Sequence, residues 1–155
     1  MTRSLSTTVS AEFVHGALEL ERTPIGLRPH RLPAWARRQA ADPQLSMAES
    51  QPSGVRLLFT TTATSIELRA HATRFGYRGA PPRPSGVFDL VVDGRLTGQA
   101  GLATATTVTI DMATGDRQTE AADVGGVLFE GLSAEEKLVE IWPPHNETVE
   151  LVELR

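Results

Sequence analysis

The sequence predicts an all-β fold, an antiparallel β-sandwich of jelly-roll type with one short helix. Apolar residues recur at every second position over much of the chain, which is typical of strands with one buried face. The 13 glycines and 10 prolines stand largely between these alternating segments, where they indicate turns. Only one segment has the composition of a helix. Many short strands joined by such turns favour two stacked antiparallel sheets.

Length and composition indicate one globular domain. The 155 residues can bury a core, and 40% of them are hydrophobic while 22% are charged. The absence of cysteine excludes disulfides, thiolate metal ligands and cysteine nucleophiles. No segment approaches the roughly 20 apolar residues of a membrane span, and the N-terminus lacks a secretory signal. We therefore expect a single β-sandwich domain over residues 1–155, with residues 1–12 as an N-terminal arm, in a cytoplasmic protein that contacts no membrane.

The helix is predicted over residues 33–41. Pro33 suits a first helical turn, and the segment that follows is rich in alanine and arginine. Asp42 and Pro43 then end it. A short helix between strands usually covers one end of a sandwich.

Strands follow the helix in order. Residues 54–62 and 64–72 alternate cleanly, and residues 86–94 end at Asp93-Gly94, a dipeptide that favours a tight hairpin with residues 95–100. The phrase Pro-Ser-Gly-Val precedes two of these strands, where proline fixes φ and glycine supplies the conformation of the turn. The remaining predicted strands are residues 105–112, 126–131, 137–142 and 148–154.

The charge distribution argues against nucleic acid as a partner. Residues 22–38 are basic and residues 116–155 are acidic, but apolar residues are interspersed in both blocks. The net charge is −4, and the isoelectric point is near 5.6 with few aromatic residues. Solvated surface is the better interpretation of both blocks.

No catalytic or metal-binding motif occurs in the sequence. There is no Gly-x-Ser-x-Gly elbow, no phosphate-binding loop and no calcium loop. The four histidines lack the spacing of metal ligands; they are His15, His30, His71 and His145. The sequence therefore predicts no catalytic residue, no metal and no cofactor for this chain alone.

A first candidate site is the segment 71–86, which we expect to be a long loop between two strands. It begins at His71 and carries Tyr77 and Arg78 among other aromatic and basic residues, a mixture that suits contacts with an anion or a sugar. The alternative is that the aromatic rings close one end of the core while the arginines remain in water.

A second candidate site is the loop after residues 137–142. Alternation places Trp142 opposite its neighbour Ile141, and two prolines then hold the chain extended. Three polar residues follow, namely His145, Asn146 and Glu147. A tryptophan beside several hydrogen-bonding groups is typical of sugar sites and of protein interfaces. The alternative is a rigid hairpin loop whose polar groups satisfy their own backbone. We expect Trp142, His145 and Glu147 to face a second domain.

Three stretches of the sequence also resemble a known family. The stretches RLLFTTTATSIELRAHATRFGYRGAPPRPSGVFDLVVDGRL, TIDMATG and VEIWPPHNETVELVELR look like the N-terminal β-sandwich domain of bacterial SGNH/GDSL-type hydrolases, a jelly roll similar to carbohydrate-binding modules. The resemblance extends from about residue 13 onward. It implies a catalytic α/β/α domain downstream. The catalytic Gly-Asp-Ser block and the Asp-x-x-His pair of that family are absent from this chain.

Three functions follow as hypotheses. The first is a non-catalytic accessory domain that packs beside an SGNH/GDSL-type esterase or acyltransferase domain and shapes the access of an acyl-ester or carbohydrate substrate. The catalytic domain would then be a partner in cis or as a separate chain. The second is an independent carbohydrate-binding module, which the scarcity of aromatic residues disfavours. The third, an enzyme complete in itself, lacks any supporting motif.

Overall fold

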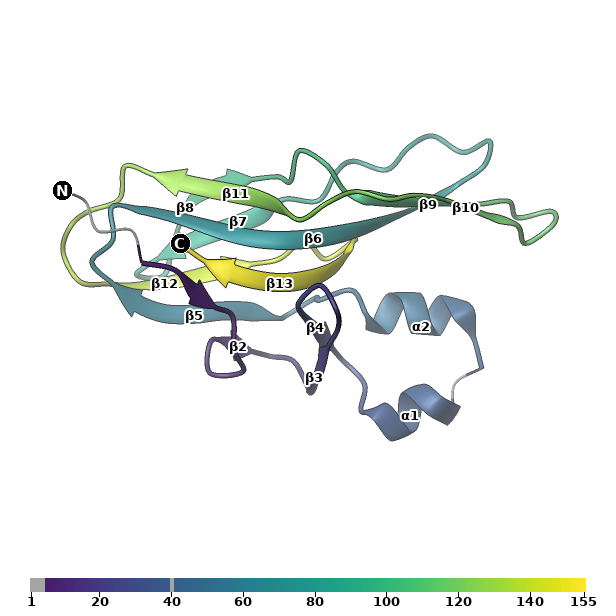
Figure 1. The fold of residues 1–155 in the computed structure, drawn as a ribbon, viewed down its shortest axis with the longest axis horizontal. Helices are drawn as coiled ribbons and strands as arrows, with labels where there is room; N and C mark the ends of the chain where they lie inside the picture. Colours follow the sequence, from purple (N-terminus) through teal and green to yellow (C-terminus); the bar gives the residue numbers. More distant parts are fainter. Residues whose placement is uncertain (1–4, 40) are drawn as a thin grey trace.

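Two packed β-sheets make up the protein (Figure 1), and the predicted all-β sandwich is confirmed. The computed structural model describes residues 5–39 and 41–155. One sheet has eight strands: β1 (Thr7–Thr8), β3 (Glu19–Arg22), β4 (Leu27–His30), β6 (Ser65–Tyr77), β9 (Thr106–Ile110), β10 (Arg117–Glu120), β11 (Gly125–Glu130) and β13 (Thr148–Leu154). The other has five: β2 (Val14–His15), β5 (Arg56–Thr61), β7 (Phe88–Val92), β8 (Arg95–Ala100) and β12 (Lys137–Trp142). No helix in these ranges is long and apolar enough to cross a membrane.

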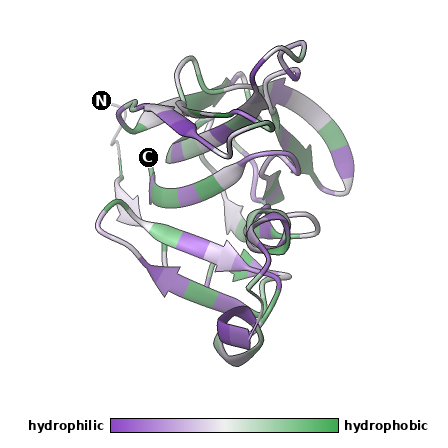
Figure 2. Cartoon of the chain, turned by 90° about the vertical axis from the view of Figure 1, so that its right-hand side faces the viewer, coloured by the Kyte–Doolittle hydropathy of each residue, from purple (hydrophilic) through white to green (hydrophobic). Residues whose placement is uncertain are grey.

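The core lies between the inner faces of the two sheets. Leu68 of β6, Leu151 of β13, Leu57 of β5 and Ile141 of β12 are completely buried there. Along each of these strands the residues between the core positions face outward; in β6 they are the polar residues Glu67, Arg69 and His71. Hydrophobic and hydrophilic colours alternate along several ribbons in Figure 2. The predicted period of two is therefore confirmed for these strands.

The hairpin between β7 and β8 has the predicted turn. Asp93 and Gly94 both adopt positive φ, 49° and 78°, which is the conformation that a two-residue hairpin needs. The two strands pair in antiparallel register from Val92 and Arg95 onward.

The helical region differs from the prediction, because it holds two helices rather than one. Helix α1 (Ala34–Gln39) lies inside the predicted range 33–41, of which residue 40 is outside the described residues. Helix α2 (Pro43–Glu49) was not predicted. The Asp42 carboxylate accepts a hydrogen bond from the backbone N–H of Gln44 at 2.8 Å and so caps α2. The Asp-Pro pair that should have ended one helix therefore starts the next one.

The N-terminal segment is also more ordered than predicted. Residues 7 and 8, expected to belong to an arm, form β1 and pair with the end of β13. Val9 is buried in the core. The first four residues of the predicted arm lie outside the described residues.

Strand β6 is longer than predicted, and its extension corrects the loop expected over residues 71–86. The strand continues to Tyr77. One edge of β6 pairs with β11 through Ala70 and then with β9 from Thr73, the second pair being parallel. The other edge pairs with β13 only as far as Thr73. Beyond Thr73, β6 therefore overruns β13 with one open edge.

The two Pro-Ser-Gly-Val segments require glycine for different physical reasons. Gly54 has a φ of +81° and open space around the position of a Cβ atom, so it supplies the predicted turn conformation. Gly86 does not have a positive φ. A Cβ atom there would lie 2.3 Å from the Pro144 Cβ and 2.9 Å from the Glu147 Cδ. Gly86 is required by close approach rather than by turn geometry.

Candidate ligand pocket

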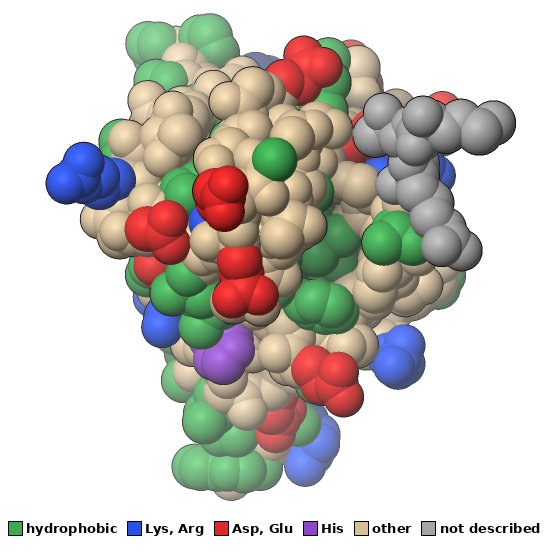
Figure 3. Space-filling view, turned by 90° about the vertical axis from the view of Figure 1, so that its left-hand side faces the viewer, with side chains coloured by type: hydrophobic (Ala, Val, Ile, Leu, Met, Phe, Trp, Pro, Cys, Tyr) green, Lys and Arg blue, Asp and Glu red, His purple; other side chains and the backbone are tan. Residues whose placement is uncertain are grey.

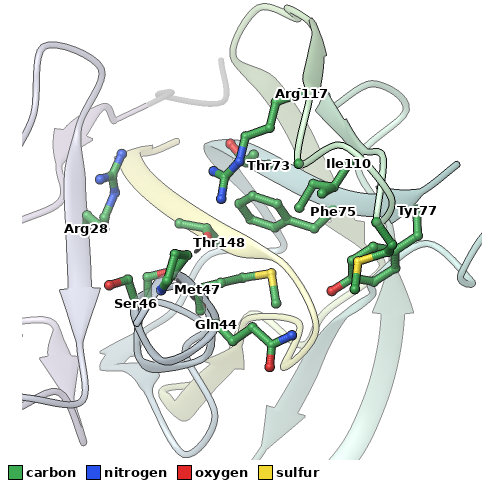
Figure 4. Close-up of a pocket in the computed structure, with 14 residues that line it drawn as sticks. Arg28, Gln44, Ser46, Met47, Thr73, Phe75, Tyr77, Ile110, Arg117 and Thr148 are labelled. Atoms are coloured by element: carbon green, nitrogen blue, oxygen red, sulfur yellow. Dashed lines mark hydrogen bonds between the residues drawn. The ribbon is translucent and has the colours of Figure 1, made fainter. Parts of the chain in front are cut away.

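A cavity of about 590 Å³ lies where β6 overruns β13 (Figure 4). One wall comes from the eight-stranded sheet and the other from α2. The apolar part of the lining consists of Pro43, Met47, Phe75, Tyr77, Ile110 and Met112. The uncharged polar part consists of Gln44, Ser46, Ser50, Thr73 and Thr148, with Gly115. Arg28 and Arg117 are the charged residues of the lining.

Strand periodicity builds the sheet wall. The core side of β6 carries Ala70 and Ala72, so Thr73, Phe75 and Tyr77 point to the outer face of the sheet. Parallel pairing sets Tyr77 beside Ile110 of β9. The rings of the segment 71–86 therefore do not close the end of the core.

Arg74 fixes the extension of β6 from its other face. The Arg74 Nε donates a hydrogen bond to the Glu147 carboxylate at 2.6 Å, and its Nη2 donates to the carbonyl oxygen of Leu102 at 3.2 Å. The same Glu147 oxygen accepts a hydrogen bond from the backbone N–H of Gly86 at 2.7 Å. Glu147 is only 2% exposed. The prediction that Glu147 faces a second domain is therefore wrong, because its carboxylate is buried and accepts hydrogen bonds from Arg74 and Gly86 within the domain.

Helix α2 forms the opposite wall with few apolar anchors. Its one buried residue is Glu49, and α1 has none. Met47 and Gln44 extend from α2 toward the cavity (Figure 4). Near the end of the helix, the hydroxyls of Ser50 and Thr148 lie 3.0 Å apart and so join this wall to the start of β13.

A row of polar residues crosses the outer face of the sheet beside the pocket. The Arg28 Nη2 of β4 donates to the Glu150 carboxylate of β13 at 2.9 Å. The other Glu150 oxygen lies 3.0 Å from the His71 Nδ1, and the His71 Nε2 lies 2.8 Å from the hydroxyl of Thr106 on β9. His71 and Glu150 are both buried. His71, a predicted binding residue, thus has both ring nitrogens occupied by partners within the domain.

The order hydroxyl, imidazole and carboxylate is the order of an acyl-transfer triad, but this row is not placed as one. The Thr106 oxygen also accepts a hydrogen bond from the backbone N–H of Ala122 at 3.1 Å. Neither described pocket includes Thr106 or His71. We assign the row to holding β4, β13, β6 and β9 in register.

A second charged cluster ties the helices to the sandwich. The His30 Nδ1 lies 2.8 Å from a Glu49 oxygen, and its Nε2 lies 2.8 Å from both the Glu21 carboxylate and the Arg37 Nη1. The hydrogen bond from His30 lowers the pKa of Glu21 below its usual value of 4.5. The pKa of Glu19 is also lowered, first by a hydrogen bond from the backbone N–H of Ala34.

Trp142 lies on the outer face of the five-stranded sheet, opposite Ile141 as predicted. It is half-buried, because the Arg56 guanidinium lies over its ring at 5.2 Å. The Arg56 Nε is 3.0 Å from a Glu140 oxygen.

The other predicted residues of this loop differ in their exposure to solvent. His145 is exposed. The Asn146 side-chain amide donates to the carbonyl oxygen of Pro84 at 3.2 Å, and its own side-chain oxygen is buried without a partner. Within the loop, Trp142 and His145 remain available to a partner, whereas Asn146 and Glu147 brace residues 84–86.

Tyr77 and Arg78, predicted together, separate in the structure. Tyr77 lines the pocket, with the guanidinium of Arg83 over its ring at 5.7 Å. Arg78 is exposed and its Nε lies 3.5 Å from an Asp111 oxygen. Sequence reasoning missed Arg28, Met47 and Arg117, because nothing in the chain order indicates that these segments meet.

The opposite end of the molecule carries a smaller hollow of about 230 Å³. Its lining includes Asp93, Glu135 and Glu136, and acidic side chains are spread over this end in Figure 3. Lys137, also in the lining, is buried and donates to three backbone carbonyl oxygens. Within the described ranges no three histidine or acidic residues are grouped to hold a metal ion. The larger pocket is therefore the stronger candidate site.

Comparison with known proteins gives two findings. The family model described as "SsfX3, N-terminal domain" matches residues 13–151. Two chains of solved structures match, and one is the salicylyl-acyltransferase SsfX3 from a tetracycline biosynthetic pathway, with a TM-score of 0.75 and 25% sequence identity. The match covers 97% of this chain and 38% of that one, so the chain spans well under half the length of this relative. Curated protein sequences gave no significant match.

Proposed function

Because the chain belongs to the family of SsfX3 N-terminal domains, we propose that it is the non-catalytic accessory domain of an acyltransferase or esterase of SGNH/GDSL type. The observation that carries the proposal is the coverage of 38% of the SsfX3 chain, which leaves most of that acyltransferase outside the matched region. The catalytic domain is then a partner, in cis or as a separate chain.

The chemistry of the described residues supports a non-catalytic role. The hydroxyl that lies beside a histidine and a carboxylate, Thr106, already accepts a backbone hydrogen bond and borders neither described pocket. An acyl-transfer nucleophile needs an approach for its substrate and donors for the developing oxyanion. The larger pocket contains hydroxyl and guanidinium groups but neither a histidine nor a carboxylate in its lining.

The end of the sandwich with the pocket is the surface we assign to the catalytic domain. The loop between β12 and β13, with Trp142 and His145, lies at this end together with the pocket, while Arg155 lies at the other end of β13 (Figure 1). A strand of seven residues spans only about 23 Å, which a domain of ordinary size covers. Docked there, a second domain would have the pocket at the rim of its active site, where it shapes substrate access.

An independent carbohydrate-binding module is the weaker alternative. Sugar platforms need open aromatic rings, yet arginines lie over the rings of both Trp142 and Tyr77. Trp35 on α1 is 60% exposed, but it stands on a short helix without buried neighbours of its own.

Activity of the isolated chain tests the non-catalytic part. We expect no hydrolysis of p-nitrophenyl acetate above a protein blank, for the wild type and for Thr106→Ala alike. Turnover that disappears in a single serine or threonine variant would show that the chain is an enzyme by itself.

Binding tests the accessory part. An SGNH/GDSL catalytic domain encoded in the same or a neighbouring reading frame is titrated with this chain, with Trp142→Ala and with Leu138→Ala. Leu138 is the matched control, because it lies on the same strand and face and is exposed. If Trp142 is an interface anchor, its loss costs more than about 1 kcal/mol, roughly a fivefold weaker Kd. Equal affinities of the three proteins would remove Trp142 from the interface, and no binding would reject the accessory role.

A further inference from the structure

The charge balance of the larger pocket is one-sided. Its lining contains two arginines and no acidic residue. The Arg28 guanidinium is compensated by Glu150 at 2.9 Å. Arg117 stands on β10, where Asp111 of the same β9–β10 hairpin pairs with Arg78 rather than with it. Figure 4 shows the Arg117 guanidinium extending over Phe75 toward the interior of the pocket. Arg117 is exposed, so the mouth of the pocket carries one solvent-accessible positive charge that no lining residue neutralises.

The body of the pocket is apolar and faces this charge. Phe75 and Ile110 on the sheet wall lie across from Met47 on the helical wall. The volume of about 590 Å³ falls within the range typical of small-molecule sites. The hydroxyls of Ser46, Thr73 and Thr148 add uncharged donors at its edges. Flexible methionine on one wall and a fixed ring on the other suit a flat apolar group.

We propose that this pocket binds a small organic monoanion with a flat apolar body, of which an aromatic carboxylate is the simplest example. The carboxylate pairs with the Arg117 guanidinium, which offers a planar set of donors that matches it. The ring system lies between Met47 and Phe75. The proposal stands without the proposed function, since binding requires only this chain.

A phosphorylated ligand fits the same residues less well. Phosphate sites gather several cations or backbone N–H groups around one dianion. Here Arg28 is already held by Glu150, and the first residue of α2 is Pro43, which has no N–H to offer. One uncompensated guanidinium matches one carboxylate.

Titration of the full chain with 2-naphthoate, followed by calorimetry and by amide chemical shifts, tests the proposal. We expect saturable binding, with shifts confined to α2, the second half of β6 and the β9–β10 hairpin. The neutral analogue 2-naphthalenemethanol is expected to bind at least tenfold more weakly. Arg117→Leu should weaken naphthoate about tenfold or more, the usual cost of losing a charged hydrogen-bond partner.

Two further variants separate the site from general effects. Arg95→Leu removes an exposed arginine outside this pocket and should change the affinity less than twofold. Met47→Glu places a carboxylate in the pocket and should abolish naphthoate binding. The amide chemical shifts of the sandwich strands should remain those of the folded protein. No binding up to about 1 mM, the weak limit of a specific site, would overturn the proposal. Equal affinity for the neutral alcohol, or equal loss in Arg95→Leu, would overturn it as well, and would leave the pocket as a docking surface.

Discussion

The two walls of the pocket are held by different forces. The sheet wall is an extension of β6, hydrogen-bonded to β9 along its length and fixed from behind by the Arg74–Glu147 pair. The helical wall, taken here as α2 together with the adjoining α1, has no buried apolar side chain in either helix. Its attachments include Glu49 on His30, Arg37 and the Ala34 N–H on Glu19, and Ser50 on Thr148. One wall is part of the cooperative unit of the sandwich, and the other is joined to it by charges and hydroxyls.

This difference indicates which wall can adjust to a ligand. Hydrophobic burial and strand pairing resist changes of pH and salt, whereas the half-exposed Arg37–Glu19 pair of the helical wall weakens with both. We therefore expect the sheet wall to be preformed and the helical wall to open locally, at a free energy well below that of global unfolding. Variants in each wall test whether the two walls differ in this way.

The largest effect is expected for Glu147→Ala in the support of the sheet wall. The change removes a buried carboxylate and leaves the partly exposed Arg74 Nε and the buried Gly86 N–H without their acceptor. Loss of one partner of a buried pair costs about 3–5 kcal/mol. Chemical denaturation should show this as a lower midpoint of one cooperative transition. Glu130→Ala, an exposed change in the same sheet, is the control and should cost almost nothing. A separate, partial transition for Glu147→Ala would mean that the extension of β6 is not part of the cooperative unit.

Glu49→Ala in the helical wall should have a smaller and local effect. It leaves the His30 Nδ1 without an acceptor, at a cost of about 1–3 kcal/mol for the helical segment. Hydrogen exchange should rise over residues 43–49 and stay unchanged in β6 and β13. Equal loss of protection in β6 would contradict the division between the two walls, as would a fall in the global midpoint as large as that of Glu147→Ala.

The smallest effect is expected from pH. The pKa of Glu21 is lowered by the hydrogen bond from His30, and Glu49, Arg28 and Arg37 also surround this cluster. A lowered pKa means that the ionised form stabilises the fold above the unfolded value of 4.5, and that this contribution is lost as the pH falls through the folded pKa. The amide protection factors of α1, which correct for the intrinsic pH dependence of exchange, should therefore fall below pH 4.5, while those of β6 stay high.

Glu21→Gln tests the origin of that pH dependence. The variant lacks the titrating carboxylate. The amide protection factors of α1 should therefore vary less with pH in the variant than in the wild type. An unchanged pH profile would assign the effect to Glu19 instead. A profile shared by α1 and β6 would again remove the contrast between the walls.

Much of the fold follows from local patterns. The predicted ranges of strands β5, β7, β8, β9, β11, β12 and β13 agree with the structure to within two residues at both ends, because their alternation is dictated by one buried face. The turn at Asp93-Gly94 was predicted because few dipeptides tolerate positive φ twice. Strands β1 to β4 and β10 are short, and their pairing depends on partners distant in the chain, so no local signal marks them.

The site could not be predicted in the same way. The pocket brings together Arg28, Met47, Phe75 and Arg117, which come from four separate segments. The loop with Glu147 looked like a binding site because its polar residues are adjacent in the sequence. Their direction was decided by what lies behind them, namely Arg74 and the Gly86 backbone, and no pattern within the loop encodes that.

The two identical Pro-Ser-Gly-Val phrases should follow different evolutionary paths. At position 54 the constraint is on backbone conformation alone, with free space around it, so related sequences should exchange glycine for asparagine or aspartate. At position 86 the constraint is on volume, because any side chain would collide with Pro144 and displace the carboxylate of Glu147. Substitution there requires a compensating change across the domain. An alignment of relatives should therefore show drift at the first glycine and covariation of the second with residues 144 and 147.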